Sequence, residues 1–188
     1  LDFANQNVIP IINGLTEYSH PCQILGDFLT IQENFKKLNN IQITWIGDFN
    51  NVLISLLHLQ DIYSFKLNVV IPYQIFKYKN KELKKYNNKK LKFLFDPITG
   101  SFNTNCIMTD VWLSMGEKDK KKEKFFKDFT INKKIMNNCA NNAIFMHCLP
   151  AKRGKEVTSE ILDSKNSVIL QQAKNRMFIQ QAILLYVL

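Results

Sequence analysis

Short apolar segments with strand-like composition alternate along the chain with segments of helical spacing, and this alternation is the strongest constraint on the fold. The segment "IQITWIG" alternates apolar and polar residues, whereas apolar residues in the segment before it recur every three or four positions. Strands that alternate with helices are typical of a doubly wound α/β fold, a parallel sheet with helices on both faces. The predicted strands are 41–47, 66–72, 91–95, 105–110 and 143–150, with a short extended segment at 167–170, and the predicted helices are 21–38, 51–63, 79–86, 118–129 and 171–188.

Three polar clusters follow directly on predicted strands. "GDFNN" ends at Asn51, "TDVWLSMG" begins at Thr109, and "HCLP" begins at His147. The carboxyl ends of parallel strands meet at one edge of the sheet, and ligands of open α/β folds bind there. We therefore expect these clusters to form one site.

The charge of the chain suggests a competing hypothesis. The formal net charge is +9, and the lysines concentrate in segments 76–93 and 117–129, where aromatic residues are interleaved. Such segments are candidates for binding nucleic acid. However, the chain has only two arginines, Arg153 and Arg176, and arginine is the preferred residue for bidentate contacts with bases and phosphates. We favour solvated helix faces and keep a basic nucleic-acid-binding module as the alternative.

Cysteine spacing and the length of the apolar runs indicate the cellular compartment of the protein. The four cysteines, Cys22, Cys106, Cys139 and Cys148, form no C-x-x-C pair, which favours a reduced intracellular protein without a zinc site. The longest apolar runs, such as "AILLYVL", are too short to cross a bilayer. The sequence opens on "LDFANQNVIP", without a methionine, and we expect it to be a piece of a longer chain.

The first two clusters each allow a ligand role and a structural role. Asp48 or Asn50 would cap the following helix, whereas the amide of Asn51 would donate to a ligand carboxylate. Asp110 would pair with a substrate ammonium, with Ser114 and the adjacent Met115 backbone at the polar end of the same ligand. The structural alternative for Asp110 is a cap for the lysine-rich helix.

The third cluster and the start of the first predicted helix offer further candidates. The Cys148 thiol would face the same edge as Asp110, although a free cysteine is more often a small buried hydrophobe. His147 is as readily structural as functional. His20 precedes a proline at a helix start, where it would donate to a carbonyl or phosphate oxygen while Gln23 bonds an amide. An ordinary capping or surface histidine is the alternative for His20.

Together and in this order, the motifs resemble those of ornithine carbamoyltransferases nearly end to end. "HPCQILGD" resembles the family's H-P-x-Q-x-L-A-D helix, and "WIGDFNNVLIS" resembles its W-x-G-D-x-N-N segment. "TDVWLSMG" resembles the D-x-W-x-S-M-G loop, and the stretch from "MHCLP" to "AKNR" resembles the H-C-L-P segment and the tail. The S-M-G loop together with H-C-L-P is specific, because aspartate carbamoyltransferases lack that pair and putrescine enzymes carry a different loop. Gly26, Ile54 and Lys174 depart from the family's common residues.

The resemblance implies two sets of ligand-binding residues and a catalytic role for Cys148, Asp110 and His20. It implies that Cys148 accepts the proton of the ornithine δ-amine and that no metal or organic cofactor takes part. The residues expected at carbamoyl phosphate are His20, Pro21, Cys22, Gln23, Cys148, Leu149 and Arg176. The residues expected at L-ornithine are Asn51, Asp110, Ser114 and Met115.

The resemblance also implies a domain organisation. Residues 1–36 would end the first, carbamoyl-phosphate domain and include an interdomain helix, 37–170 would be the ornithine-binding domain, and helix 171–188 would pack back onto the first domain. The S-T-R-T loop of that first domain has no counterpart here, so we expect little activity from this chain alone. The family implies a homotrimer in the cytoplasm or an organellar matrix, without nucleic acid or membrane as partner. A degenerate, non-catalytic remnant is the remaining alternative.

Overall fold

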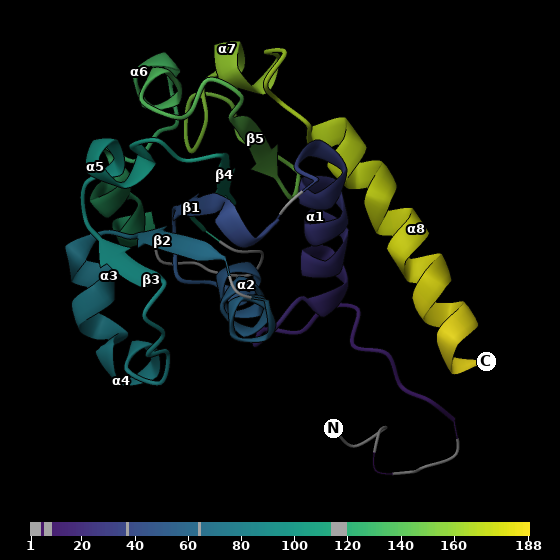
Figure 1. Ribbon diagram of the computed structural model, residues 1–188. Helices are drawn as coiled ribbons and strands as arrows, with labels where there is room; N and C mark the ends of the chain where they lie inside the picture. Colours follow the sequence, from purple (N-terminus) through teal and green to yellow (C-terminus); the bar gives the residue numbers. More distant parts are fainter. Residues whose placement is uncertain (1–4, 6–8, 37, 64, 114–119) are drawn as a thin grey trace.

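A parallel sheet forms the centre of the computed structural model (Figure 1), which describes residues 5, 9–36, 38–63, 65–113 and 120–188. The sheet has five strands in the order β3-β2-β1-β4-β5, all parallel. The doubly wound α/β fold predicted from the sequence is confirmed. The strands are β1 Gln42–Ile46, β2 Lys66–Val70, β3 Leu91–Leu94, β4 Cys106–Thr109 and β5 Ile144–His147.

The register of the central strands brings their carboxyl ends together. Thr109 of β4 lies opposite His147 of β5, and the Thr109 hydroxyl donates to the carbonyl of Ile46 at the end of β1. Most positions of β1, β2, β4 and β5 are buried because helices cover both faces of the sheet, and Trp45 is fully buried in the middle of the sheet. The polar clusters that follow β1, β4 and β5 therefore start from one edge.

Helices cover both faces of the sheet. α2 lies on one face, and the short α5 and α6 lie on the other (Figure 1). This placement follows from the right-handed crossovers that parallel strands require. The helices are α1 Pro21–Asn34, α2 Asn51–Ile62, α3 Tyr73–Tyr78, α4 Asn80–Leu83, α5 Pro97–Ser101, α6 Lys133–Asn137, α7 Ser159–Leu162 and α8 Ile169–Val187, with 3-10 turns η2 Leu38–Asn40 and η3 Lys120–Phe126.

Several predicted elements differ from the observed ones. The helix expected at 79–86 is limited to α4, and α3 precedes it. The described part of the helix expected at 118–129 is the 3-10 segment η3, which buries Phe126 against Trp112 with ring centroids 5.3 Å apart. In the segment expected to be extended at 167–170, only Ser167 pairs with β5, and α8 begins at Ile169.

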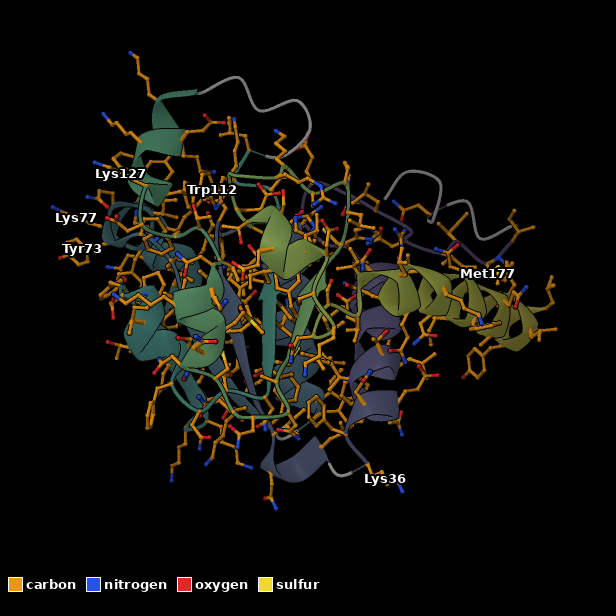
Figure 2. All side chains as sticks on the ribbon, turned by 90° about the horizontal axis from the view of Figure 1, so that it is seen from above. Lys36, Tyr73, Lys77, Trp112, Lys127 and Met177 are labelled. Carbon is orange, nitrogen blue, oxygen red and sulfur yellow. The ribbon has the colours of Figure 1, made fainter. Side chains whose placement is uncertain are left out.

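The carboxyl-terminal helix α8 packs along α1, on the same side of the molecule (Figure 1). Gly26 permits this close approach, because a Cβ atom there would lie 3.0 Å from Cγ and 3.2 Å from Cα of Arg176. The distal half of α8 extends away from the sheet, and Figure 2 shows Met177 on it. Large apolar side chains of α8 stay exposed, among them Leu170, Met177, Phe178, Leu185 and Tyr186. Among the described residues, no helix combines the length and the apolarity needed to span a membrane.

Candidate functional site

A cavity of about 1160 Å³ opens at the carboxyl edge of the sheet. An adjoining cavity of about 830 Å³ shares part of its lining, including Gln23 and Arg176. Pro21 and Cys22 line neither cavity, and the Cys22 side chain is buried. Ser114 and Met115 lie outside the described residues. The predicted site residues that line the larger cavity are His20, Gln23, Asn51, Asp110, Cys148, Leu149 and Arg176.

Asp110 accepts hydrogen bonds from three groups around it. It directly follows β4, and its side chain is almost fully buried. One carboxylate oxygen accepts from the Asn50 amide at 2.8 Å, and the other accepts from the Val111 N–H at 2.7 Å and from the Cys148 thiol at 2.8 Å. A buried carboxylate that three donors hold in one orientation is a fixed anionic anchor for a cationic ligand.

The cap of α2 is part of the same network. Asn50, not Asp48, caps the helix, because its side-chain oxygen accepts from the N–H groups of Val52 and Leu53, both at 3.1 Å. Its side-chain nitrogen is then directed at Asp110. Asp48 instead forms an ion pair with Lys122 in the cavity lining. Lys122 was not predicted as a site residue, and its only sequence signal is its position in the lysine-rich segment after the S-M-G loop.

Asn51 lines the cavity, but its side-chain amide donates to the Thr16 carbonyl at 2.7 Å. Thr16 belongs to the irregular segment that precedes α1. A ligand carboxylate that binds Asn51 must therefore share or displace this hydrogen bond. The contact of Asn51 with ornithine stays a prediction.

Cys148 acts as a hydrogen-bond donor in the ligand-free site. Burial raises the pKa of the Cys148 thiol well above its ordinary value, and the Asp110 charge and the hydrogen bond to Asp110 raise this pKa further. The thiol is therefore protonated at neutral pH. Its predicted role as a proton acceptor requires it first to lose that proton.

Buried polar atoms without a partner mark the amino-terminal end of α1. His20 Nδ1, Gln23 Oε1 and Arg176 Nε have no hydrogen-bond partner among the described residues. Burial and the Arg176 charge lower the pKa of His20, which keeps the imidazole neutral at pH 7. Buried polar groups are nearly always paired in folded proteins, and the three side chains that carry these atoms line the larger cavity, which suits a polar ligand.

His147 has a structural role. Its Nδ1 accepts from the Leu149 N–H at 2.9 Å, so the ring proton is on Nε2, which donates to Glu156 at 3.0 Å. Both side chains are fully buried. Donor atoms of Asp110, His147 and Cys148 lie within 4.8 Å of one another, but a metal would have to displace one of these His147 bonds. The prediction that no metal takes part stays a prediction.

The backbone beside Cys148 is unusual. Leu149 has a φ of 58°, in the left-handed region that non-glycine residues rarely adopt. Such residues cluster at ligand sites, where the surrounding structure compensates their strain. At Leu149 the carbonyl and N–H point in directions that a regular strand would not allow, and the N–H reaches back to His147.

The comparisons with known proteins identify the family of this fold and site. The family described as aspartate/ornithine carbamoyltransferase, Asp/Orn binding domain, matches residues 39–187. The chain belongs to this family. It is 44% identical to the ornithine carbamoyltransferase of Prochlorococcus marinus (strain MIT 9312) over 97% of this chain and 61% of that protein. The anabolic ornithine carbamoyltransferase of Campylobacter jejuni superimposes with a TM-score of 0.86 at 34% identity, over 99% of this chain and 64% of that chain.

The chain spans about 61% to 64% of the length of these relatives. A third relative is the catabolic ornithine carbamoyltransferase of Thermoplasma acidophilum, 40% identical over 98% of this chain and 63% of that protein.

The family match includes both lysine-rich segments, and several lysines pair with acids, as Lys79 does with Glu82 and Lys155 with Glu123. The nucleic-acid alternative therefore gains no support.

The thiol environment predicts slow alkylation of Cys148. We expect iodoacetamide at pH 8 to modify Cys148 at least about tenfold more slowly than an exposed cysteine, because the thiolate is the reacting form. Asp110→Asn removes the charge of Asp110, which is one cause of the raised pKa of Cys148, and is expected to accelerate the reaction several-fold. Peptide mass spectrometry measures both rates.

Cys139 is the internal control for this measurement. Burial alone raises the pKa of Cys139 to about 12, so its alkylation rate is expected to be the same in both proteins. An unchanged Cys148 rate in Asp110→Asn would mean that the carboxylate does not hold the thiol.

Proposed function

We propose that this chain is the ornithine-binding part of an ornithine carbamoyltransferase. The reaction transfers the carbamoyl group of carbamoyl phosphate to the δ-amine of L-ornithine and gives L-citrulline and phosphate. The observation that carries the proposal is the convergence of Asp110 and Cys148 with His20, Gln23 and Arg176 around one cavity. An anionic anchor beside a cluster of unpaired polar groups suits one cationic and one anionic substrate.

Ornithine would bind through its α-ammonium and carboxylate. The ammonium would pair with Asp110, and Asn51 would donate to the carboxylate. When the ammonium binds Asp110, it takes the place of the Cys148 thiol as a donor. The δ-amine would then lie beside Cys148, as the resemblance predicts.

Carbamoyl phosphate would occupy the region of the three unpaired atoms. Arg176 would contact its phosphate, the Gln23 oxygen would accept from its NH₂ group, and neutral His20 would donate to its carbonyl oxygen. This oxygen gains negative charge when the amine attacks, and one donor to such an oxyanion contributes on the order of 3 kcal/mol to transition-state stabilisation.

The bond changes balance with one proton released. The δ-nitrogen forms a bond to the carbamoyl carbon, and the bond from that carbon to the phosphate oxygen breaks. The δ-ammonium must first lose a proton, and a lysine-like ammonium has a pKa of about 10. The Cys148 thiol must first give its own proton to solvent, and the resulting thiolate, with its raised pKa, is a base strong enough to accept the proton of the δ-ammonium. The second proton that the δ-nitrogen loses when the bond forms leaves with the phosphate.

The proposal includes a carbamoyl-phosphate domain as a partner, because a large part of each relative lies outside the match. The exposed apolar side chains of α8 support the expectation that this helix packs on such a domain. The predicted boundaries at residues 36 and 170, the homotrimer, the arginine-biosynthetic role and the cytoplasmic location stay predictions of the resemblance.

Calorimetric titration of the 188-residue chain with L-ornithine tests the proposal. We expect ornithine to bind at least about tenfold more tightly than L-norvaline, which lacks the δ-amine, and 5-aminopentanoate, which lacks the α-ammonium, because each lost contact leaves a buried group unpaired. The chain is then joined to the first domain of the Prochlorococcus relative and assayed for citrulline. Equal affinity for all three ligands, together with no citrulline from the joined protein, would contradict the proposal.

A further inference from the structure

Asp27 is a fully buried carboxylate that connects α1 to α8. It lies one helical turn after Gln23, and one of its oxygens accepts from the side-chain NH₂ groups of Gln23 at 2.7 Å and of Gln172 at 2.8 Å. Its other oxygen has no partner among the described residues. Asp27 lines neither cavity, so it does not itself meet a ligand.

The orientation of Gln172 is fixed by the backbone. Its side-chain oxygen accepts from the His147 N–H at 2.9 Å, and a backbone N–H is only a donor. The NH₂ group of Gln172 must therefore face Asp27, which makes the shared Asp27 oxygen an acceptor. Since this oxygen accepts, Gln23 must also direct its NH₂ group at Asp27.

Because the NH₂ group of Gln23 faces Asp27, the side-chain oxygen of Gln23 lies on the opposite side of the amide. The Gln23 oxygen is buried, has no partner among the described residues, and belongs to a side chain that lines both cavities. A ligand that reaches this buried oxygen would meet an acceptor, and an acceptor pairs only with a ligand that carries N–H or O–H.

We propose that Asp27 is a positioning residue that holds the side-chain amide of Gln23 with its oxygen toward the cavity, and thereby makes the site select a donor substrate that carries an NH₂ group. The proposal rests on the proposed function, because it concerns the carbamoyl phosphate subsite. The site would then distinguish two acyl phosphates of nearly equal shape and charge. Carbamoyl phosphate carries an NH₂ group where acetyl phosphate carries a methyl group.

The size of the selection follows from the cost of an unpaired buried acceptor. A ligand methyl group against the Gln23 oxygen leaves that oxygen desolvated and unpaired, which weakens binding by about tenfold or more. Without Asp27 the amide is free to rotate, and the site then presents an NH₂ group or a mixture.

The protonation state of Asp27 does not change the orientation that it gives to Gln23. Burial raises the pKa of Asp27 from 3.8 to about 7, while the Gln172 and Gln23 hydrogen bonds and the Arg176 charge oppose this and the Asp110 charge adds to it. Cys106 and Cys148 are the other titratable groups near it, and burial raises the pKa of both thiols. A proton on Asp27 would occupy the oxygen that has no partner among the described residues, and the shared oxygen would still accept from Gln23, so the preference for carbamoyl phosphate is expected to be equal at pH 8 and pH 6.

Nuclear magnetic resonance on the ligand-free 188-residue chain tests the positioning directly. The side-chain NH₂ signal of Gln23, assigned by its loss in Gln23→Met, is expected to exchange slowly with solvent in the wild type. The protection is expected to fall at least about tenfold in Asp27→Leu and to persist in Asp27→Asn, whose oxygen still accepts. Fast exchange in the wild type, or equal protection in Asp27→Leu, would overturn the proposal.

Dissociation constants for carbamoyl phosphate and acetyl phosphate test the selection. We expect the preference for carbamoyl phosphate to fall about tenfold in Asp27→Leu, and to persist in Asp27→Asn. Thr30→Val is the matched control, because Thr30 accepts from Asn175 in the same α1–α8 contact without touching Gln23. Its preference is expected to equal that of the wild type, and an equal loss in Thr30→Val would mean that Asp27 acts only through the packing of the two helices.

The two measurements separate failure of this proposal from failure of the proposed function. Protection that depends on Asp27, with neither acyl phosphate bound, would leave the orientation of Gln23 established and remove carbamoyl phosphate as the ligand. Tight carbamoyl phosphate binding with a preference that Asp27→Leu does not change would support carbamoyl phosphate as the ligand and overturn the role of Asp27 in the selection.

Discussion

The substitution Asp110→Asn is expected to weaken the binding of L-ornithine by about a hundredfold. The Asp110 carboxylate is held by Asn50, Val111 and Cys148 in the buried edge of the sheet, so it is preorganised for an ammonium group. Removing one partner of a buried, hydrogen-bonded charge pair costs about 2 to 5 kcal/mol, and a hundredfold change in affinity corresponds to about 3 kcal/mol. Asparagine has nearly the same shape, so the loss does not arise from a cavity.

Ligand analogues and a second aspartate make this measurement specific. If Asp110 pairs with the α-ammonium, the hundredfold loss is expected to persist for L-norvaline and to disappear for 5-aminopentanoate. Asp96 is the matched control, because it lies just after β3, two residues beyond its end, but caps α5 and lies outside both cavities. An affinity for ornithine that Asp110→Asn leaves unchanged, or that Asp96→Asn lowers to the same extent, would refute the assignment.

The site residues that could be predicted are those whose position follows from the strand pattern. Asp110 and Cys148 each come directly after an apolar strand, so the parallel sheet alone places them at one edge. Asn51 begins a helix at the same edge and reaches the cavity for the same reason. The choice between Asp48 and Asn50 as the cap of α2 could not be made, because both side chains suit a cap and only tertiary contacts assign Asp48 to Lys122.

The short helices could not be predicted. α5, α6 and α7 have four or five residues each, which is too few for an apolar repeat at helical spacing. They are instead fixed by local contacts: the side chains of Asp96 and Asn132 cap α5 and α6. The lysine-rich segment η3 was predicted as an α-helix from its phenylalanines, but their inward orientation is equally compatible with the 3-10 turn that is observed.

The motif "HPCQILGD" contains Gln23 and Asp27, but the contact of Asp27 with Gln172 has no sequence signal, because the two glutamines come from helices at opposite ends of the chain. Gln172 lies 145 residues after Asp27, and a polar residue on an amphipathic helix normally faces solvent. Only the approach of α8 to α1, which Gly26 permits, turns these residues into a buried cluster. The function of Gln23 was predicted from its motif, whereas the direction of its amide depends on this contact.

The buried charge of Asp27 also makes the stability of the protein dependent on pH. The pKa of Asp27 is about 7 in the folded protein against 3.8 for an ordinary aspartate, so the folded state binds the proton more tightly than the unfolded state. The contribution of Asp27 to stability is therefore fully present below pH 4 and is lost as the pH rises to about 7. At about 1.4 kcal/mol for each pH unit, the loss amounts to roughly 4 kcal/mol at most.

Asp27→Asn is expected to remove this loss, because asparagine keeps the acceptor for Gln23 and Gln172 and carries no charge. Its free energy of unfolding, measured by urea denaturation, is expected to exceed that of the wild type by up to roughly 4 kcal/mol at pH 8 and by much less at pH 5. Thr30→Val is expected to shift the stability equally at both pH values, since no charge changes. Parallel stability curves for the wild type and Asp27→Asn would show that Asp27 titrates like an exposed aspartate and is therefore not buried as a charge between α1 and α8.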